Sequence, residues 1–216
     1  QLPDYAASPA GQGVLRRLIR AWGDPGKRRF PRRRQNYRAT LCTGLSTLWK
    51  LFHDKDYAAI DASCWMIINE SPDGYAIMHV SGKTGSLAVG EIAALQTEFS
   101  ADWKICIIRW AVSENQEHLE LGLQILATRA TPALLALSAH TNDTENLSVL
   151  ILPEIPALRE TEMLVTQTGS LPPQQNHFVL IIENETLAIR EAQNTGIAEQ
   201  NSYVEVFSIQ PDPLNL

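Results

Sequence analysis

After residue 62 the chain is dominated by short stretches in which apolar and polar residues alternate, the pattern of β-strands that bury one face. Turn residues separate these stretches. In the first part of this region the alternating stretches predict five strands: 63–69, 74–80, 87–95, 102–112 and 118–126. Short strands at this spacing indicate a small barrel or a sandwich.

A second set of strands follows a break at residues 128–143, where Pro132 and a run of small residues interrupt the pattern. Five more strands are predicted beyond the break: 147–152, 162–168, 177–183, 186–191 and 203–209. We interpret the two sets as two β domains with a boundary near residue 130, and one continuous sandwich is the alternative.

The chain before residue 63 has other periodicities. Residues 13–22 predict a short amphipathic helix, whose apolar face is expected to pack on a protein partner, on a neighbouring domain or on the body of this chain. Five apolar residues recur there at helical spacing: Val14, Leu15, Leu18, Ile19 and Trp22. From Ala39 to Phe52 the pattern suits a strand at its start and one or two turns of helix at its end. The predicted organisation is residues 1–27 (lead-in and helix), 28–130 (first β domain with an arginine segment) and 131–216 (second β domain).

Charge is distributed unevenly along the chain, whose net charge is −6. Ten of its 18 basic residues lie between Arg16 and Arg38, together with a single acidic residue, Asp24. A positive segment on an acidic body predicts an anionic partner. Nearly all of these basic residues are arginine, whose planar guanidinium matches phosphate and guanine edges. A solvated basic segment without a ligand is the alternative.

Composition excludes several classes of protein. The 44% hydrophobic and 19% charged content is that of an ordinary globular protein. No apolar run approaches the roughly 20 residues that span a bilayer, so we expect no membrane span. Cys42, Cys64 and Cys106 lack metal-ligand spacing and predict reduced thiols in a cytoplasmic protein. The scattered histidines predict no metal site. Since neither a catalytic triad order nor a phosphate-binding loop is present, we expect no enzyme and no cofactor. The sequence begins with Gln1 rather than Met, which we interpret as a processed product or a fragment.

Arginines in the basic segment recur four residues apart. Three pairs share this spacing: Arg28 and Arg32, Arg29 and Arg33, and Arg34 and Arg38. In extended backbone, which Pro31 favours, residues four apart share a face about 13 Å from each other. Such a pair can hold two points of a flat, doubly charged ligand. We prefer Arg34 and Arg38 because they directly precede the first candidate strand.

The segment Asn69-Glu70-Ser71-Pro72-Asp73-Gly74 lies between two predicted strands and predicts a turn. Asn and Ser side chains bond nearby backbone groups, and Pro72 fixes one backbone angle. Gly74 permits a positive φ or a close approach of the backbone to a ligand. On its own the segment is more typical of an ordinary hairpin turn.

Taken together, the spaced arginines, the strand after them and the Asn-x-Ser-x-x-Gly turn followed by Tyr75 resemble the PilZ domain family, bacterial receptors for cyclic di-GMP. The resemblance covers about residues 28–127 and extends to the order of the later strands. It implies a mainly β chain with a six-stranded antiparallel barrel of PilZ type, with the second β region as a separate small domain. It also implies cyclic di-GMP as the ligand.

The resemblance assigns roles to residues by position. Arg34 and Arg38 would hold guanine and phosphate, while Asn69, Ser71 and Gly74 would line the other side of the ligand. Arg33 occupies the position at which family members with a basic residue tend to accept a stacked ligand dimer, and Arg29 and Arg32 belong to the competing pairs. Two features depart from the family pattern: 31 residues separate Arg38 from Asn69, and the second β region follows the barrel instead of preceding it.

These observations predict a cyclic di-GMP receptor that signals by conformational change. The arginine segment would fold onto the barrel when the ligand neutralises its charges, and the helix at 13–22 would then shift against a protein partner. Two alternatives stay open. A nucleic-acid-binding protein would use the same arginines on phosphates, although the acidic body counts against it. A PilZ-like module without a ligand would bind only proteins.

Overall fold

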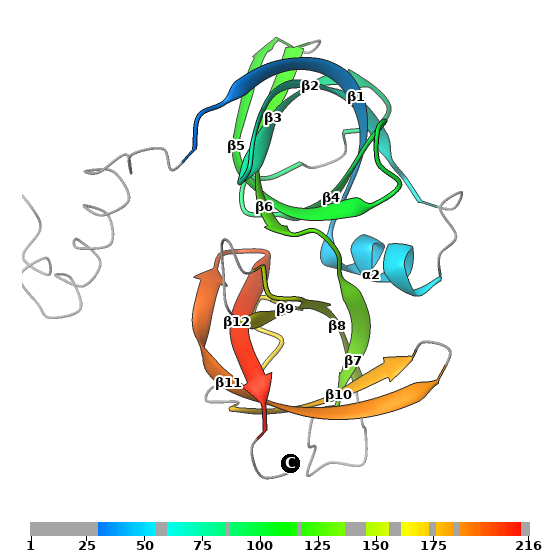
Figure 1. The fold of residues 1–216 in the computed structure, drawn as a ribbon, viewed down its shortest axis with the longest axis vertical. Coiled ribbons are helices and arrows are strands. Elements are labelled where there is room, and N and C mark those ends of the chain that lie inside the picture. Colours follow the sequence, from blue (N-terminus) through cyan, green and yellow to red (C-terminus); the bar gives the residue numbers. More distant parts are fainter. Residues whose placement is uncertain are drawn as a thin grey trace, which may run out of the picture. The chain divides into compact units, whose positions relative to one another are not determined.

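The computed structural model describes residues 30–54, 60–84, 87–115, 118–136, 146–155, 161–172, 176–183 and 186–212. The chain divides into two compact units, residues 1–31 and residues 32–216. Arg29 and the helix predicted at residues 13–22 lie outside the described residues. The fold below is therefore that of the second unit (Figure 1).

Six antiparallel strands of the second unit close into a first barrel, in the order β1-β2-β3-β6-β5-β4 (Figure 1). They are β1 (Arg33–Thr43), β2 (Ser63–Ser71), β3 (Gly74–Ser81), β4 (Ile92–Thr97), β5 (Trp103–Asn115) and β6 (His118–Ala127). Their alternate apolar residues fill the interior, with Trp65, Ile67 and Ile77 fully buried. The predicted six-stranded antiparallel barrel is confirmed.

The second β region is also a closed barrel of six antiparallel strands, in the order β10-β11-β12-β9-β8-β7. Its strands are β7 (Thr131–Ala136), β8 (Asn146–Leu152), β9 (Glu162–Gln167), β10 (His177–Glu183), β11 (Leu187–Gln200) and β12 (Val204–Pro211). Phe178 and Phe207 meet edge to face in its interior, with ring centroids 5.8 Å apart. The prediction of a mainly β chain with a second small β region after the first barrel is confirmed.

Two sequence predictions about strands were wrong. Strand β7 occupies part of the segment predicted as a break: Ala133 and Leu135 point into the second barrel and are buried. The strand predicted at 87–95 begins only at Ile92, because Gly90 adopts a positive φ of 95° and the chain turns there. The amide of Gly90 donates to the carbonyl of Ile108 on β5 over 2.8 Å, which fixes this turn against the barrel.

The ambiguous stretch at residues 39–52 contains both predicted elements. Strand β1 ends at Thr43 and helix α2 (Leu45–His53) follows it directly. Gly44 makes the change of direction with a φ of 91°, a conformation that a side chain would strain. Leu48 and Leu51 form the buried stripe of α2. Within the described segments, no helix has the length and apolar character needed to cross a membrane.

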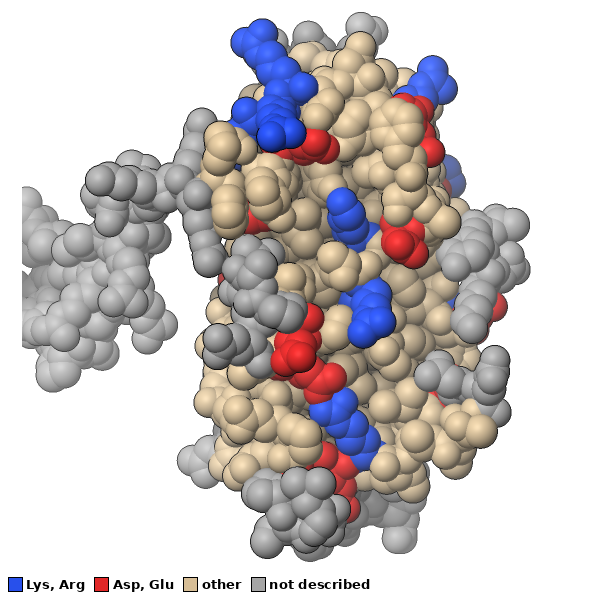
Figure 2. All heavy atoms as spheres, viewed as in Figure 1, with Lys and Arg blue, Asp and Glu red and all other residues tan. Residues whose placement is uncertain are grey.

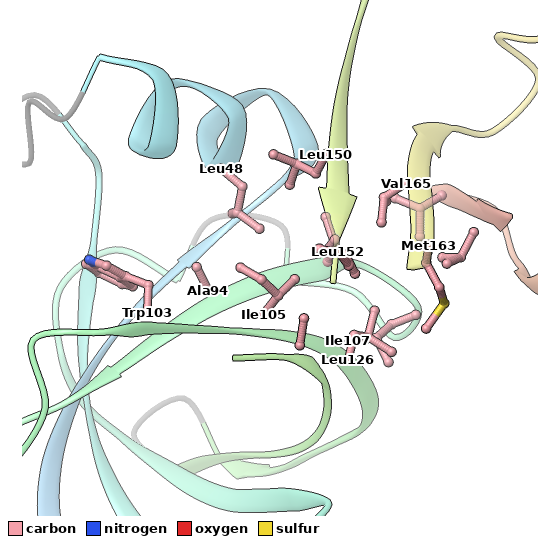
Figure 3. Packing of buried hydrophobic residues seen from close by; sticks show 14 of the residues in the cluster. Leu48, Ala94, Trp103, Ile105, Ile107, Leu126, Leu150, Leu152, Met163 and Val165 are labelled. Atoms are coloured by element: carbon pink, nitrogen blue, oxygen red, sulfur yellow. The ribbon is translucent and has the colours of Figure 1, made fainter. Parts of the chain in front are cut away.

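A shared apolar cluster, here termed the inter-barrel core, joins α2 to the outer faces of both barrels (Figure 3). Leu48, Ile105 and Ile107 contribute from the first barrel and its helix. Leu150 and Val165 contribute from the second. Each such side chain stabilises the packing by about 1.5–3 kcal/mol when fully buried. The predicted division into domains near residue 130 stays a prediction, because this core joins the two barrels.

Polar contacts surround the inter-barrel core. The indole Nε1 of Trp49 on α2 donates a hydrogen bond to the carbonyl of Ala133 on β7 over 2.9 Å. The guanidinium of Arg109 on β5 binds both carboxylate oxygens of Glu199 on β11, at 2.9 and 3.0 Å. Bidentate pairs of this kind fix orientation as well as adding energy. The two barrels are thus held in one arrangement by packing and by directed bonds.

Candidate functional site

The predicted arginine pair and the predicted turn lie on neighbouring strands. Arg34 on β1 is the direct partner of Asn69 on β2 in the strand register, and Arg38 is the partner of Met66. Directly paired residues on antiparallel strands have Cβ atoms about 5 Å apart. The structure therefore places Arg34 and Asn69 side by side, while Arg38 lies further along β1, away from the turn.

Exposed and buried positions alternate along β1. Arg34 and Arg38 are exposed, whereas Tyr37 is partly buried and Ala39 is buried in the barrel interior. Both arginines therefore belong to the outer face of the barrel, on either side of a register irregularity in β1. None of the ion pairs recorded among the described residues involves either arginine. Their guanidinium groups are accessible to an anion from solvent.

The surface around these strands carries charges of both signs. Figure 2 shows basic side chains grouped over the region where β1 and β2 lie in Figure 1, with carboxylates beside them. Over the second barrel, basic and acidic side chains alternate in the same view. On this face, basic side chains are thus grouped over the first barrel.

A carboxylate fixes the arginine-bearing part of β1 from the inside. Glu70 on β2 accepts hydrogen bonds from the amide of Gln35 and from the hydroxyl of Tyr37, both over 2.6 Å. Burial and the hydrogen bond to Glu70 raise the pKa of Tyr37, so its hydroxyl stays a donor. The register between β1 and β2 shifts between Arg34 and Tyr37. Glu70 bridges this irregularity and so positions the arginines on either side.

No pattern in the sequence indicates the role of Glu70. It occupies a variable position of the turn motif, and its two partners lie 33 and 35 residues away along the chain. Only the strand register brings the three side chains together.

The turn itself is a tight hairpin between β2 and β3, in which Ser71 pairs with Gly74. The hydroxyl of Ser71 lies 2.7 Å from Oδ1 of Asp73 and 3.2 Å from the carbonyl of Gly74. The carbonyl of Asp73 accepts a hydrogen bond of 2.9 Å from the amide of Ile125. Ser71 and Asp73 therefore stabilise the turn and attach it to β6.

Gly74 has a structural explanation that needs no ligand. A Cβ atom at this position would lie 2.2 Å from the carbonyl oxygen of Leu123 on β6, far closer than van der Waals contact. The glycine therefore allows β3 and β6 to pair at this point. Its predicted role in lining a ligand stays a prediction.

The remaining predicted residues lie at the start of β1. Arg33 is exposed and is the register partner of Glu70, and Arg32 is exposed just before the strand. Arg29 lies outside the described residues. Three neighbouring exposed arginines, Arg32 to Arg34, thus lie at the start of β1, the end of the strand nearest the hairpin.

Other chemistry has little support in the described part of the chain. No group of three or more His, Cys, Asp or Glu residues there could hold a metal ion. Burial raises the pKa of the Cys42 and Cys106 thiols to about 12, which keeps them protonated at neutral pH. Buried thiols of this kind pack as small apolar side chains.

Comparison with known proteins finds a matching family model for part of the chain. Residues 50–132 match the family model described as "Cyclic-di-GMP receptor FimW, middle PilZ domain". The match runs from within α2 through β2 to β6 and ends at the beginning of β7, so it includes the turn at Asn69 but not β1.

A curated relative agrees with the family match. The chain is 28% identical over 142 residues to the cyclic-di-GMP receptor FimW of Pseudomonas aeruginosa. This alignment covers 63% of the chain and 23% of the relative, so the chain spans less than a quarter of the relative's length. No solved structure matches the chain significantly. The resemblance to the PilZ family predicted from the sequence is thereby confirmed over residues 50–132.

Proposed function

We propose that this chain is a receptor for cyclic di-GMP and binds the dinucleotide on the outer face of the first barrel, beside Arg34, Arg38 and Asn69. The main observation in support is the register that pairs Arg34 with Asn69. The name of the P. aeruginosa relative, a cyclic-di-GMP receptor, supports the same ligand. The chain would act by binding rather than by catalysis.

The chemistry of the ligand suits these side chains. Cyclic di-GMP carries two phosphates and two guanines. Arginine binds phosphate oxygens through charge-assisted hydrogen bonds and binds guanine O6 and N7 in a bidentate manner. Arg34 and Arg38, which lie on one face of β1, would hold two separate points of the ligand. The amide of Asn69 would bond a polar edge beside Arg34.

Arg33 is relevant to the number of ligand molecules that the site binds. It is exposed next to Arg34, and the family resemblance implies that a basic residue here favours two stacked ligand molecules. We extend the proposal to a stacked dimer, in which Arg33 would contact the second molecule. Arg29 and Arg32 would add positive charge near the site without holding a defined part of the ligand.

The signalling step stays a prediction. Folding of the arginine segment onto the barrel and movement of the helix at 13–22 against a protein partner concern residues outside the described part of the chain. The predicted cytoplasmic location likewise stays a prediction, consistent with an intracellular second messenger as ligand.

Isothermal titration calorimetry of the whole chain with cyclic di-GMP tests the proposal. We expect saturable binding, and a loss of about tenfold to a hundredfold in affinity for Arg34→Ala and for Arg38→Ala, since each removes a charge-assisted contact worth roughly 1.5–3 kcal/mol. Arg33→Ala should lower the stoichiometry from two ligands towards one.

Lys83→Ala is the matched control. Lys83 follows the end of β3 opposite the hairpin and is 83% exposed, so its loss should leave the affinity unchanged. Absence of binding heat at high micromolar ligand would refute the proposal. Equal affinity for a single-stranded oligonucleotide, falling steeply with salt, would instead favour nucleic-acid binding.

A further inference from the structure

The hairpin formed by β10 and β11 extends beyond β7 on one side of the second barrel (Figure 1). Strand β11 pairs with β10 over residues 187–193, but its pairing with β12 begins only at Ala192. In the described part of the chain, the edge of β11 that faces away from β10 therefore has no neighbouring strand over residues 187–190. The backbone groups of such an edge can pair with another strand.

Two residues direct their backbone groups to this free edge. The carbonyl of Glu191 accepts a hydrogen bond of 3.3 Å from the amide of Asp212, on the side of β12. Successive residues of a strand direct their N–H and C=O groups to opposite edges, so Leu187 and Ile189 direct theirs to the same edge as Glu191. No strand pairs with these groups among the described residues. Two N–H donors and two C=O acceptors are thus open to pairing.

The side chains of the same two residues are apolar and exposed. Leu187 is 67% exposed and Ile189 is 68% exposed, and because they are two residues apart they share one face of the strand. Ile189 is the register partner of Ile181 on β10, which in turn is the partner of Leu134 on β7. Ile181 follows Leu180, which lies inside the barrel, so this apolar row belongs to the outer face. The row leads across three strands to the free edge.

Carboxylates border the apolar row at both ends. Glu183, whose side chain is 50% exposed, is the register partner of Leu187, and Glu191 follows Ile189 on the same face. Residues 131–216 together hold eleven acidic residues and two arginines. This surplus of negative charge favours a basic partner at the edge, and it disfavours a second copy of the same acidic barrel.

Other free strand ends are less regular. The free parts of β1 and β5 contain register shifts, and so does the half of β11 that pairs with β12. Such irregularities twist an edge and hinder the pairing of a further strand. The pairing of β10 with β11 has no shift over residues 187–193. The start of β11 is therefore a regular edge with a complete set of backbone groups.

We propose that residues 187–190 form a docking site for a partner protein, which adds a basic, extended segment to the barrel as a further strand. Main-chain hydrogen bonds would hold the segment, and its alternate side chains would give specificity. Apolar side chains two residues apart would cover Leu187 and Ile189, and a Lys or Arg at the next alternate position would face Glu191. The basic residue of the edge, Arg190, is paired with Glu162 and does not oppose such a partner.

Fluorescence anisotropy of a labelled peptide with the whole chain tests the proposal. The peptide Lys-Thr-Val-Thr-Val-Thr-Lys has the alternating apolar and basic pattern that the edge requires. We expect saturable binding at low salt, weakened at least about tenfold by Ile189→Pro, because this variant loses one main-chain donor and one apolar contact. The N–H of Ile189 does not face β10, so proline there should leave the hairpin paired. Ile189→Lys keeps the donor and should weaken binding by repelling the lysines of the peptide.

Val89→Lys is the matched control, since it adds the same charge at an aliphatic side chain that is 53% exposed just before β4, and it should bind as the wild type does. If Ile189→Pro does not fold, Ile189→Lys decides. A peptide that does not saturate the chain at millimolar concentration overturns the proposal, and so does unchanged binding by Ile189→Lys. Equal affinity for Glu-Thr-Val-Thr-Val-Thr-Glu would exclude a basic partner. If light scattering shows a dimer that Ile189→Lys dissociates, a second copy occupies the edge and the proposal is wrong.

Discussion

Around the hairpin of the first barrel, individual residues divide into those that build the fold and those that face solvent. Glu70 accepts bonds from Gln35 and Tyr37, and Gly74 allows β6 to approach. Arg34, by contrast, is exposed on the outer face. The hairpin region therefore contains both structural and solvent-facing positions, and substitutions within it should have separable effects.

Gly74→Ala should destabilise the fold whether or not a ligand is bound. Its Cβ would meet the Leu123 carbonyl at 2.2 Å, and this atom belongs to the backbone and cannot rotate away. We expect the free energy of unfolding to fall by about 1–3 kcal/mol, the usual range for an overpacked site. Urea denaturation without ligand measures this change.

Gly169→Ala provides the comparison. Gly169 has a φ of 74° and nothing within 4 Å of an added Cβ, so only backbone strain of about 1 kcal/mol is expected there. A Gly74→Ala variant as stable as the wild type would show that β3 and β6 can separate at this point. The glycine would then have to be explained by the ligand.

Residues of the site differ in how well the sequence predicts them. Arg34 and Asn69 could be proposed as ligand-binding residues because each belongs to a short motif with a fixed local spacing. The contact between Trp110 and Gly122 could not be predicted, since it depends on how β5 pairs with β6. The same holds for Glu70, whose partners are more than 30 residues away.

Among the secondary-structure elements, predictions failed where neighbouring elements cover both faces. β7 buries Ala133 and Leu135 in its barrel, and α2 packs beside β7 through the Trp49 bond to Ala133. A strand covered on both sides does not alternate between polar and apolar residues. α2 was only half recognised for a related reason: it is a short helix whose stripe of Leu48 and Leu51 packs into the inter-barrel core.

The last turn of α2 predicts a pH-dependent contribution to stability. The ring of His53 stacks on Trp49, with centroids 4.3 Å apart. Its nitrogens lie 2.8 Å from Asp54 and 3.5 Å from Glu183 on β10. The hydrogen bond to Asp54, followed by that to Glu183, raises the pKa of His53. A raised pKa in the folded state stabilises the protein below the unfolded value of about 6.5, and this contribution is lost as the pH rises through the folded value.

His53→Gln should therefore lower the free energy of unfolding at pH 5.5, by about 0.5 kcal/mol as for a partly exposed ion pair. At pH 9 the two proteins should differ little. Urea denaturation at both pH values measures the difference in stability between the wild type and His53→Gln. In a Glu183→Gln background, which lacks one of the two carboxylates, this difference should be smaller at pH 5.5. An effect of His53→Gln that is equal at both pH values would contradict the electrostatic origin.

For the molecule as a whole, the inter-barrel core makes the stability of one barrel depend on the other. All five tryptophans, Trp22, Trp49, Trp65, Trp103 and Trp110, precede the second barrel in the sequence. Tryptophan fluorescence therefore reports chiefly on the first part of the chain, and Trp49 also senses β7 through its hydrogen bond to Ala133. This distribution allows the coupling between the barrels to be measured with a substitution made in the second.

Leu180→Ala should shift the tryptophan unfolding transition although Leu180 lies inside the second barrel, where it is fully buried. Removing a buried leucine side chain costs about 2–5 kcal/mol, and the inter-barrel core should transmit this loss to the first barrel. Leu187→Ala, at a side chain that is 67% exposed, should leave the transition unchanged. Independent barrels would show no shift for either variant, and would support a domain boundary near residue 130.

Closure of both sheets also restricts how this chain can recognise a protein. Within the described residues every strand of either barrel has a bonded neighbour on each side over part of its length. Unpaired backbone is therefore confined to the strand ends that extend beyond the closed sheets, such as the start of β1, the end of β5 and the start of β11. Recruitment by strand addition, a frequent mode of peptide capture, is limited to these ends. A protein that docks elsewhere on the barrels has to contact side chains, and single substitutions on the surface should be enough to locate where it binds.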